Sequence, residues 1–335
     1  MSVLFICHKN SVYGHSVYTR RSSGLYNSTS FIVRALRARG VHSEIVEVTD
    51  NNDIDREVTK YRPRIVVIEA LWVVPEKFDI LKKLHPKVKW FIHLHSDMPF
   101  LALEGIAMDW IVRCAAKGIG IIANSEESFE ALKPIVPPDE LIYLPNVYLS
   151  EPRRARLKGG RIIDVGCFGA VRPLKNQLLQ ALASIQFARD LGKGLRFHVN
   201  NARVETGGAP VLKNLRQLFQ DIPNAELVEN RWYEPEDFLK HLQLNIDIGL
   251  QVSLTETFNV VTADYVTAGL PIVVSKEVKW VSQFSKAIDN SLPDIVEKMH
   301  RAWTCKPLIR LNQIYLRRFA NKASRSWYEF VRGTL

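Results

Sequence analysis

Cysteine is scarce in this chain, and no two cysteines are spaced as a Cys-x-x-Cys pair. The 335 residues contain only Cys7, Cys114, Cys167 and Cys305. This scattering argues against a disulfide framework and a structural zinc site, and it is typical of a reducing compartment. Long apolar runs are also missing, since Val3–Cys7 is too short for a signal peptide and no uncharged run reaches the length of a membrane span. We therefore expect a soluble, cytoplasmic protein without integral membrane contact.

Acidic residues are absent before Glu44, although six basic residues precede it. The net charge of +10 is uneven: residues 1–150 carry 18 basic and 17 acidic side chains (+1), and residues 151–335 carry 27 and 18 (+9). Basic surfaces of this kind attract polyanions or an anionic membrane. The alternative is a solvated basic face with the charge needed to bind one diphosphate.

One stretch near the middle of the second half predicts a βαβ unit. Asn245–Val252 and Ile272–Ser275 are apolar and suit buried parallel strands, and Asn259–Ala268 has helical spacing that ends at Gly269. A right-handed crossover would join the two strands. The length of 335 residues and a hydrophobic content of 47% fit two α/β domains of this type.

Two acidic residues flank the predicted helix of this unit. Glu256 lies in the loop before the helix, and Asp264 follows about two turns later. A helix N-terminus suits a phosphate, and a neighbouring carboxylate suits the hydroxyls of a sugar. The pair therefore suggests a nucleotide sugar, although a helix cap at Glu256 and a solvated Asp264 fit the spacing equally well.

The same stretch resembles the signature of retaining glycosyltransferases of family 4. The matching residues are Ser253, Glu256, Phe258, Asp264, Ala268, Gly269, Leu270, Pro271 and Val273. The chain departs from the family at Asp264, where the family has Glu, and at Thr257 and Asn259, where it usually has Gly. The resemblance implies an α/β chain with the GT-B fold, in which two Rossmann-like domains have parallel sheets facing a central cleft. The departures leave the identity of the donor open.

A second loop has the composition of an anion site. After the predicted strand Arg161–Phe168 come a glycine turn, Arg172 and Lys175, and then a predicted helix over Asn176–Leu191. Cations in this position can neutralise charge on a leaving diphosphate. The resemblance implies this role for Arg172 and Lys175; the alternative is that both are surface charges that cap a loop.

A loop of about twenty residues, spanning 8–28, follows the predicted strand Ser2–Cys7 and precedes a predicted helix over Thr29–Arg39. Loops of this length inside a compact domain usually bind a ligand. Its histidines, arginines and tyrosines suit phosphates and stacked rings. The resemblance implies that Gly24 lets the backbone approach the donor diphosphate, and Ser23 replaces the first glycine of the family.

Histidines end the predicted strand Lys89–Leu94, where ligand sites of parallel sheets lie. His93, His95 and Asp97 could bind a metal, serve only the structure, or bring His95 to the transferred sugar, as the resemblance implies. No fourth ligand or known metal spacing accompanies them, which argues against the metal. The resemblance favours the role of His95 at the sugar over a purely structural one. No Asp-x-Asp pair is suitably placed either, so no obligatory metal and no cofactor besides the sugar donor is expected.

The predicted domain organisation has four parts. They are an N-terminal Rossmann-like acceptor-side domain (1–150), a linker (151–160), a C-terminal Rossmann-like domain that binds the nucleotide sugar (161–300) and a helical segment that crosses back to the first domain (301–335). In the second domain, Asn200 stands where the family has a glycine, and Trp232 is either a core residue or a stacking partner of the nucleotide base.

The resemblance predicts an enzyme, a monomer or homodimer, that moves a hexose or pentose from a nucleoside-diphosphate sugar to an acceptor hydroxyl with retention. Its catalytic residues would be Glu256 and His95, and its substrate-binding residues Arg172, Lys175, Asp264, Gly24, Phe258, Asn259 and Thr257. The acceptor stays open between hydroxymethylated bases in DNA, which bacteriophage enzymes modify, and a polysaccharide or lipid-linked sugar. A catalytically idle GT-B scaffold or nucleic-acid-binding module is the alternative from another class.

Overall fold

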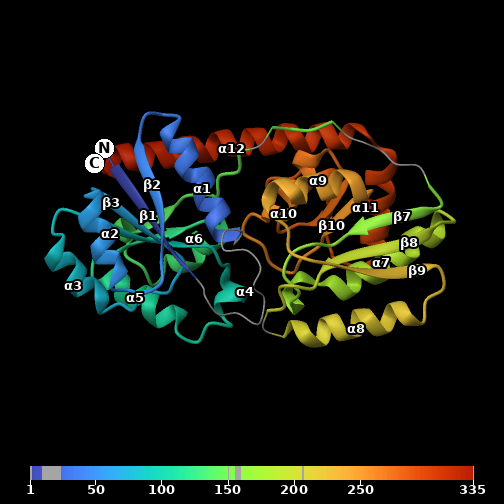
Figure 1. Cartoon of the computed structure of the whole chain (residues 1–335), viewed down its shortest axis with the longest axis horizontal. Helices are drawn as coiled ribbons and strands as arrows, with labels where there is room; N and C mark the ends of the chain where they lie inside the picture. The colour runs from blue at the N-terminus through green and yellow to red at the C-terminus, as the bar shows by residue number, and fades with distance from the viewer. Residues whose placement is uncertain (1, 10–23, 150, 155–159, 206, 335) are drawn as a thin grey trace. The chain divides into compact units, whose positions relative to one another are not determined.

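The computed structural model describes residues 2–9, 24–149, 151–154, 160–205 and 207–334. The chain divides into two compact units. In the described part, residues 2–149 and 319–334 belong to the first unit and residues 151–318 to the second. The long helix α12 (Pro307–Thr334) therefore contributes its first half to the second unit and its last half to the first (Figure 1).

The first unit is built on a six-stranded parallel sheet with the order β2-β1-β3-β4-β5-β6 (Figure 1). The strands are β1 (Ser2–His8), β2 (His42–Val48), β3 (Ile65–Glu69), β4 (Lys89–Leu94), β5 (Gly120–Ala123) and β6 (Leu141–Tyr143). The helices are α1 (Gly24–Arg37), α2 (Asp53–Tyr61), α3 (Lys77–Leu84), α4 (Met98–Leu101), α5 (Ala107–Ala116) and α6 (Glu126–Leu132), with a 3-10 turn at Pro138–Glu140.

Helices cover both faces of this sheet, as parallel strands require. One face packs against α2, α3, α5 and α6 through a core that includes Ile54, Phe78 and Ile111. The other packs against α1 and the last half of α12, where Trp327 is fully buried and donates its indole N–H to the Pro145 carbonyl at 2.9 Å. The end of α12 is therefore part of the first unit's core.

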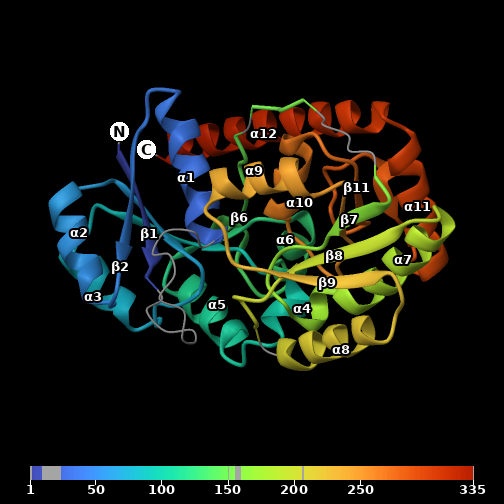
Figure 2. The ribbon, with the colours of Figure 1, turned by 45° about the vertical axis from the view of Figure 1, so that its right-hand side comes forward.

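The second unit has its own six-stranded parallel sheet, with the order β12-β11-β10-β7-β8-β9. The strands are β7 (Ile162–Gly166), β8 (Gly194–Asn200), β9 (Ala225–Asn230), β10 (Ile248–Gln251), β11 (Ile272–Ser275) and β12 (Lys286–Ala287). The helices are α7 (Gln177–Asp190), α8 (Gly208–Gln220), α9 (Pro235–Asn245), α10 (Val260–Ala268) and α11 (Leu292–Thr304), with 3-10 turns at Pro173–Lys175 and Gln283–Ser285. The helix α8 lies beside β9 (Figure 2).

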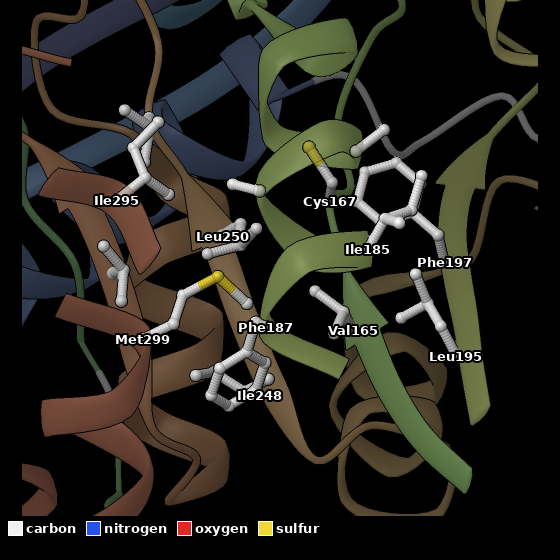
Figure 3. Packing of buried hydrophobic residues seen from close by; sticks show 14 of the residues in the cluster. Val165, Cys167, Ile185, Phe187, Leu195, Phe197, Ile248, Leu250, Ile295 and Met299 are labelled. Atoms are coloured by element: carbon white, nitrogen blue, oxygen red, sulfur yellow. The ribbon is translucent and has the colours of Figure 1, made fainter. Parts of the chain in front are cut away.

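The core of the second unit lies between this sheet and α7, α8 and α11. Phe187 of α7 and Met299 of α11 meet the apolar side chains of β7 and β10 (Figure 3). Phe197 of β8 stacks on Phe219 of α8 with ring centroids 5.7 Å apart. On the opposite face, α10 covers β10 and β11, and α9 packs against α10. The unit is thus a three-layered α/β structure like the first.

Two predicted boundaries are wrong by three residues or more. The helix expected over Thr29–Arg39 begins at Gly24, so the end of the predicted 8–28 loop is helical. The segment before Thr29 is mostly polar, so apolar spacing could not reveal that it is helical. Tertiary packing nevertheless buries its Ser28. The strand expected from Asn245 begins at Ile248, because α9 continues to Asn245. Residues 10–23 of the predicted loop lie outside the described residues.

The ring of Tyr265 lies so close to the second sheet that two strand positions accommodate only glycine. A Cβ on Gly166 would lie 2.1 Å from the Tyr265 hydroxyl oxygen, and one on Gly249 would lie 2.7 Å from ring carbons. The helix α10 is therefore held tightly against β7 and β10.

None of the helices in the described part of the chain has the length and apolar character needed to cross a lipid bilayer.

Replacing Gly249 tests this packing. We expect Gly249→Ala to lower the free energy of unfolding by about 1–3 kcal/mol, since the buried ring must move to admit the methyl group. Urea unfolding followed by circular dichroism measures the change. Gly105→Ala is the matched control, because no heavy atom lies within 4 Å of its Cβ position, and it should stay within about 0.5 kcal/mol of the parent. Equal losses for the two variants would contradict the packing argument.

Candidate functional site

The loop between β10 and α10 is shaped by the backbone of Asn259. This residue adopts a left-handed conformation (φ 63°), and its Oδ1 accepts the backbone N–H of Thr262 at 2.8 Å, which caps the helix. Its Nδ2 donates to Gln251 Oε1 at 3.0 Å. Asn tolerates positive φ better than other residues with a Cβ, so it can replace the glycine that the resemblance expects. The hydrogen bonds of its side chain stabilise the loop and the start of α10.

Phe258, predicted to bind substrate, is a core residue by its side chain. It is 1% exposed and stacks on Trp280 with ring centroids 5.5 Å apart. Its backbone carbonyl accepts the indole N–H of Trp280 at 2.7 Å. The neighbouring Thr257 is partly exposed, and Asp264, within α10, is 9% exposed. Phe258 thus anchors the loop that carries Glu256, two residues earlier in the chain.

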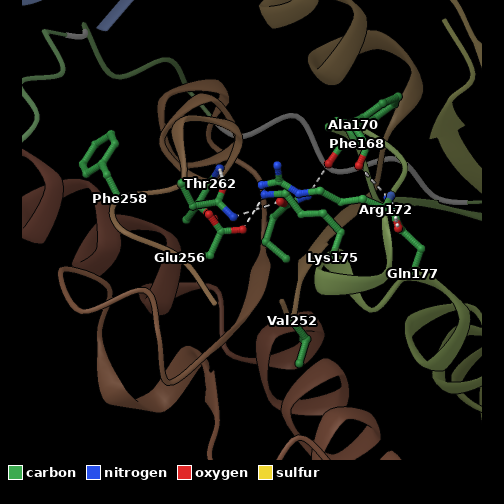
Figure 4. Close-up of polar contacts among 12 residues, drawn as sticks. Phe168, Ala170, Arg172, Lys175, Gln177, Val252, Glu256, Phe258 and Thr262 are labelled. Carbon is green, nitrogen blue, oxygen red and sulfur yellow. Dashed lines mark hydrogen bonds and ion pairs between the residues drawn. The ribbon is translucent and has the colours of Figure 1, made fainter. Parts of the chain in front are cut away.

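The loop after β7 brings Lys175 to Glu256. Lys175 ends a 3-10 turn (Pro173–Lys175), and Asn176 then takes a left-handed conformation before α7. The Lys175 ammonium forms an ion pair with Glu256 Oε1, and the two side chains are 12% and 8% exposed (Figure 4). The loop predicted to bind the diphosphate and the loop predicted to bind sugar hydroxyls are therefore joined by one nearly buried ion pair.

Arg172 has an acidic partner that the sequence analysis did not identify. Its Nη1 lies 2.6 Å from Glu205 Oε2, and Arg203 Nη2 lies 2.6 Å from Glu205 Oε1. Burial alone would raise the pKa of Glu205, but the charges of Arg203 and Arg172 outweigh it and lower the pKa. Glu205 is therefore an ionised carboxylate that fixes both guanidinium groups.

Asn200 ties the Gly169 loop to the segment that follows β9. Its Oδ1 accepts the Gly169 N–H at 2.9 Å, and its Nδ2 donates to the Arg231 carbonyl at 3.0 Å. The next residue, Trp232, lies 5.6 Å beneath the Arg203 guanidinium, in a cation–π contact. A bifunctional side chain at residue 200 explains why Asn can stand in place of the glycine that the resemblance expects.

In the first unit, His95 contacts an acid that was also missed. Glu69 ends β3, and its Oε2 lies 2.5 Å from His95 Nε2 and 3.0 Å from His93 Nδ1. Glu69 and His93 are fully buried, whereas the His95 side chain is 16% exposed. Asp97 instead caps α4 and accepts the Ser128 hydroxyl at 2.8 Å.

The same three residues are the group in the described part of the chain that could hold a metal ion, with candidate donor atoms within 4.8 Å of one another. One nitrogen of each histidine lies within hydrogen-bond distance of the same Glu69 oxygen, at 2.5 Å for His95 and 3.0 Å for His93. The group is accordingly a hydrogen-bonded carboxylate with two imidazole donors. Burial alone would raise the pKa of Glu69, but His93 and His95 together lower it to about 2.

Gly24 is the first residue of α1, and among the described residues no heavy atom beyond its chain neighbours and its own helix backbone lies within 4 Å of its Cβ position. Ser23, the other half of the predicted pair, lies outside the described residues.

The low pKa of Glu69 makes the stability of the protein depend on pH. Because the folded-state pKa (about 2) is below the ordinary value of 4.5, the contribution is present above about pH 4.5 and is lost as the pH falls towards 2. We expect Glu69→Gln to weaken the dependence of unfolding free energy on pH between about pH 5 and pH 3, measured by urea unfolding. Glu130→Gln, at a 64% exposed side chain, should keep the parent slope. A parent slope in Glu69→Gln would refute the assignment.

The sequence matches no protein-family model and no curated protein. Solved structures match it over nearly its whole length at low identity. Sucrose-phosphate synthase from Thermosynechococcus elongatus is 10% identical with a TM-score of 0.71, over 99% of this chain and 98% of that one. A UDP-forming α,α-trehalose-phosphate synthase from Burkholderia xenovorans is 10% identical with a TM-score of 0.69, over 100% and 98%. HepE from Anabaena, solved in complex with UDP-glucose, is 13% identical with a TM-score of 0.68, over 99% and 100%.

These neighbours are glycosyltransferases of the GT-B fold. At such low identity the likeness is evidence about architecture. The expected fold class is confirmed: the chain is an α/β protein with the GT-B architecture of two Rossmann-like units, each with a six-stranded parallel sheet.

Proposed function

We propose that this protein is a glycosyltransferase that uses a nucleoside-diphosphate sugar as its donor. The observation that carries the proposal is the meeting of Lys175 and Glu256 at the N-terminal end of α10. An ammonium group binds phosphate, a carboxylate accepts hydrogen bonds from sugar hydroxyls, and a helix N-terminus favours negative charge. The GT-B architecture, shared with HepE in its UDP-glucose complex, supports the same donor class.

The residues take the following roles. Lys175 and Arg172 hold the diphosphate and neutralise the charge that develops as it leaves. Glu256 binds hydroxyls of the sugar, and Asp264 binds those of the nucleotide ribose. In the second unit, the backbone of the loop from Thr257 to Asn259 completes the donor site. In the first unit, the resemblance assigns the backbone of Gly24 to the donor diphosphate and His95 to the transferred sugar. No obligatory metal is part of this scheme.

The sugar is transferred with retention, as the resemblance implies, and the leaving phosphate helps to deprotonate the acceptor. For the acceptor we propose hydroxymethylated bases in DNA. This is supported by the excess of +9 in residues 151–335 and by cations such as Arg310, Arg317 and Arg325 exposed on α12. Sugar acceptors are the competing class.

Thermal unfolding with a panel of nucleoside diphosphates tests the donor site. A diphosphate at about a hundred times its dissociation constant should stabilise the protein by roughly 2.7 kcal/mol, which is a shift of several degrees. Lys175→Ala should weaken that binding by about tenfold or more, because it removes a charge-assisted hydrogen bond. Lys213→Ala, on the exposed side of α8, is the matched control. No shift with any diphosphate would overturn the proposal in favour of an idle GT-B module.

Turnover tests the role of Glu256. We expect Glu256→Ala to lower kcat by about 10²-fold or more, the loss seen when one transition-state contact is removed. Asp237→Ala, at an exposed acid of α9, should retain parent activity. The assay offers the panel donors with hydroxymethylated DNA and with sugar acceptors, and NMR of the product gives the anomeric configuration. Parent turnover in Glu256→Ala would remove this residue from the site, and product on sugar alone would exclude DNA.

A further inference from the structure

Glu69, His93 and His95 lie on one face of the first sheet. Glu69 and His93 are direct neighbours in the parallel register of β3 and β4, and His95 follows His93 by two residues, the period of a strand. Both histidines contact the same carboxylate oxygen, Oε2, at 2.5 and 3.0 Å. The pairing of β3 with β4 therefore brings these three side chains together.

The carboxylate determines which nitrogen of His95 carries a proton. Glu69 is ionised, because its pKa is lowered to about 2 by the contacts that oppose its burial. An ionised carboxylate only accepts hydrogen bonds, so His95 Nε2 must be the protonated nitrogen that donates to it. In a neutral imidazole the other nitrogen is then an acceptor. When His95 is neutral and donates through Nε2, its Nδ1 atom is therefore a hydrogen-bond acceptor.

We propose that Glu69 is a positioning residue, which acts through His95 by fixing the Nε2–H tautomer and the orientation of the ring. This inference rests on the proposed function, in which His95 contacts the transferred sugar. It adds the chemistry of that contact: Nδ1 accepts a hydrogen bond from a hydroxyl group of the ligand. A phosphate or carbonyl oxygen, which has no proton to donate, is thereby disfavoured at this position.

Burial explains why Glu69 suits this role. Its side chain is 0% exposed, and a buried carboxylate without donors is costly, so it holds its imidazole donors firmly. His85 and Asp55 form a contrasting pair in the same unit: their atoms lie 2.7 Å apart, but the Asp55 side chain is 45% exposed. Water can replace the histidine at Asp55, whereas Glu69 has no such access.

Nitrogen NMR of the histidine side chains tests the proposal directly. Long-range proton–nitrogen correlation on protein labelled with 15N-histidine, at about pH 8 and thus above the ordinary imidazole pKa of about 6.5, distinguishes protonated from unprotonated ring nitrogens. We expect wild-type His95 to be protonated at Nε2 only. We expect Glu69→Gln, whose amide can either donate or accept, to populate both tautomers, and Glu69→Asp to restore the Nε2–H form. Asp55→Asn is the matched control and should change His85 alone.

Kinetics provides the second readout. Glu69→Gln should lower kcat by about 10- to 100-fold, the loss typical when the partner that orients a functional imidazole is removed, while KM for the donor changes by less than about threefold. A protein that shows the predicted tautomers but transfers no sugar would refute the proposed function and leave the positioning of His95 intact.

Three results would overturn the inference. They are an Nδ1–H tautomer in the wild-type protein, unchanged His95 nitrogens and kcat in folded Glu69→Gln, and a stoichiometric metal ion in the purified protein that Glu69→Gln loses. If Glu69→Gln fails to fold, the wild-type spectrum and Glu69→Asp still decide the question.

Discussion

Parallel strand pairing is the constraint on which both halves of this molecule depend. Parallel neighbours must be joined by crossovers, so helices cover both faces of each sheet and every strand-to-helix loop emerges at the same edge. In the second unit the order places β7 beside β10. Lys175 and Glu256, which are 81 residues apart in sequence, meet for that reason. In the first unit, the pairing of β3 with β4 brings Glu69 to His93 and His95 in the same way.

Each predicted cationic or imidazole site residue is matched by an acid of its own unit. Lys175 pairs with Glu256, Arg172 with Glu205, and His95 with Glu69. Little-exposed charges need such partners, because desolvation without one is costly. Under the proposed function, a donor must therefore exchange the Lys175–Glu256 ion pair for contacts with phosphate and hydroxyl groups. Its net affinity is the difference between two sets of polar contacts.

Departures from the family pattern are explained locally by the structure. Asn259 supplies the left-handed backbone that glycine would supply, and it also caps α10. Asn200 joins two loops through both ends of its amide. Both asparagines make side-chain hydrogen bonds that glycine could not make, and they add side chains where glycine would leave space.

The sequence by itself determined the elements and the loops that carry charge. The apolar pattern predicted β4 and β11 with their observed bounds, and the glycine after α10 marked the end of that helix. Such patterns depend only on residues close together in the sequence. The sequence could not predict that Glu205 would form an ion pair with Arg172, or that Glu69 would hydrogen-bond to His95. A hint did exist at Glu69, since an acid within the apolar strand RIVVIEA needs a buried partner. The partners lie 26 to 33 residues away, and only tertiary structure decides which charges meet, because strand order and register bring them together.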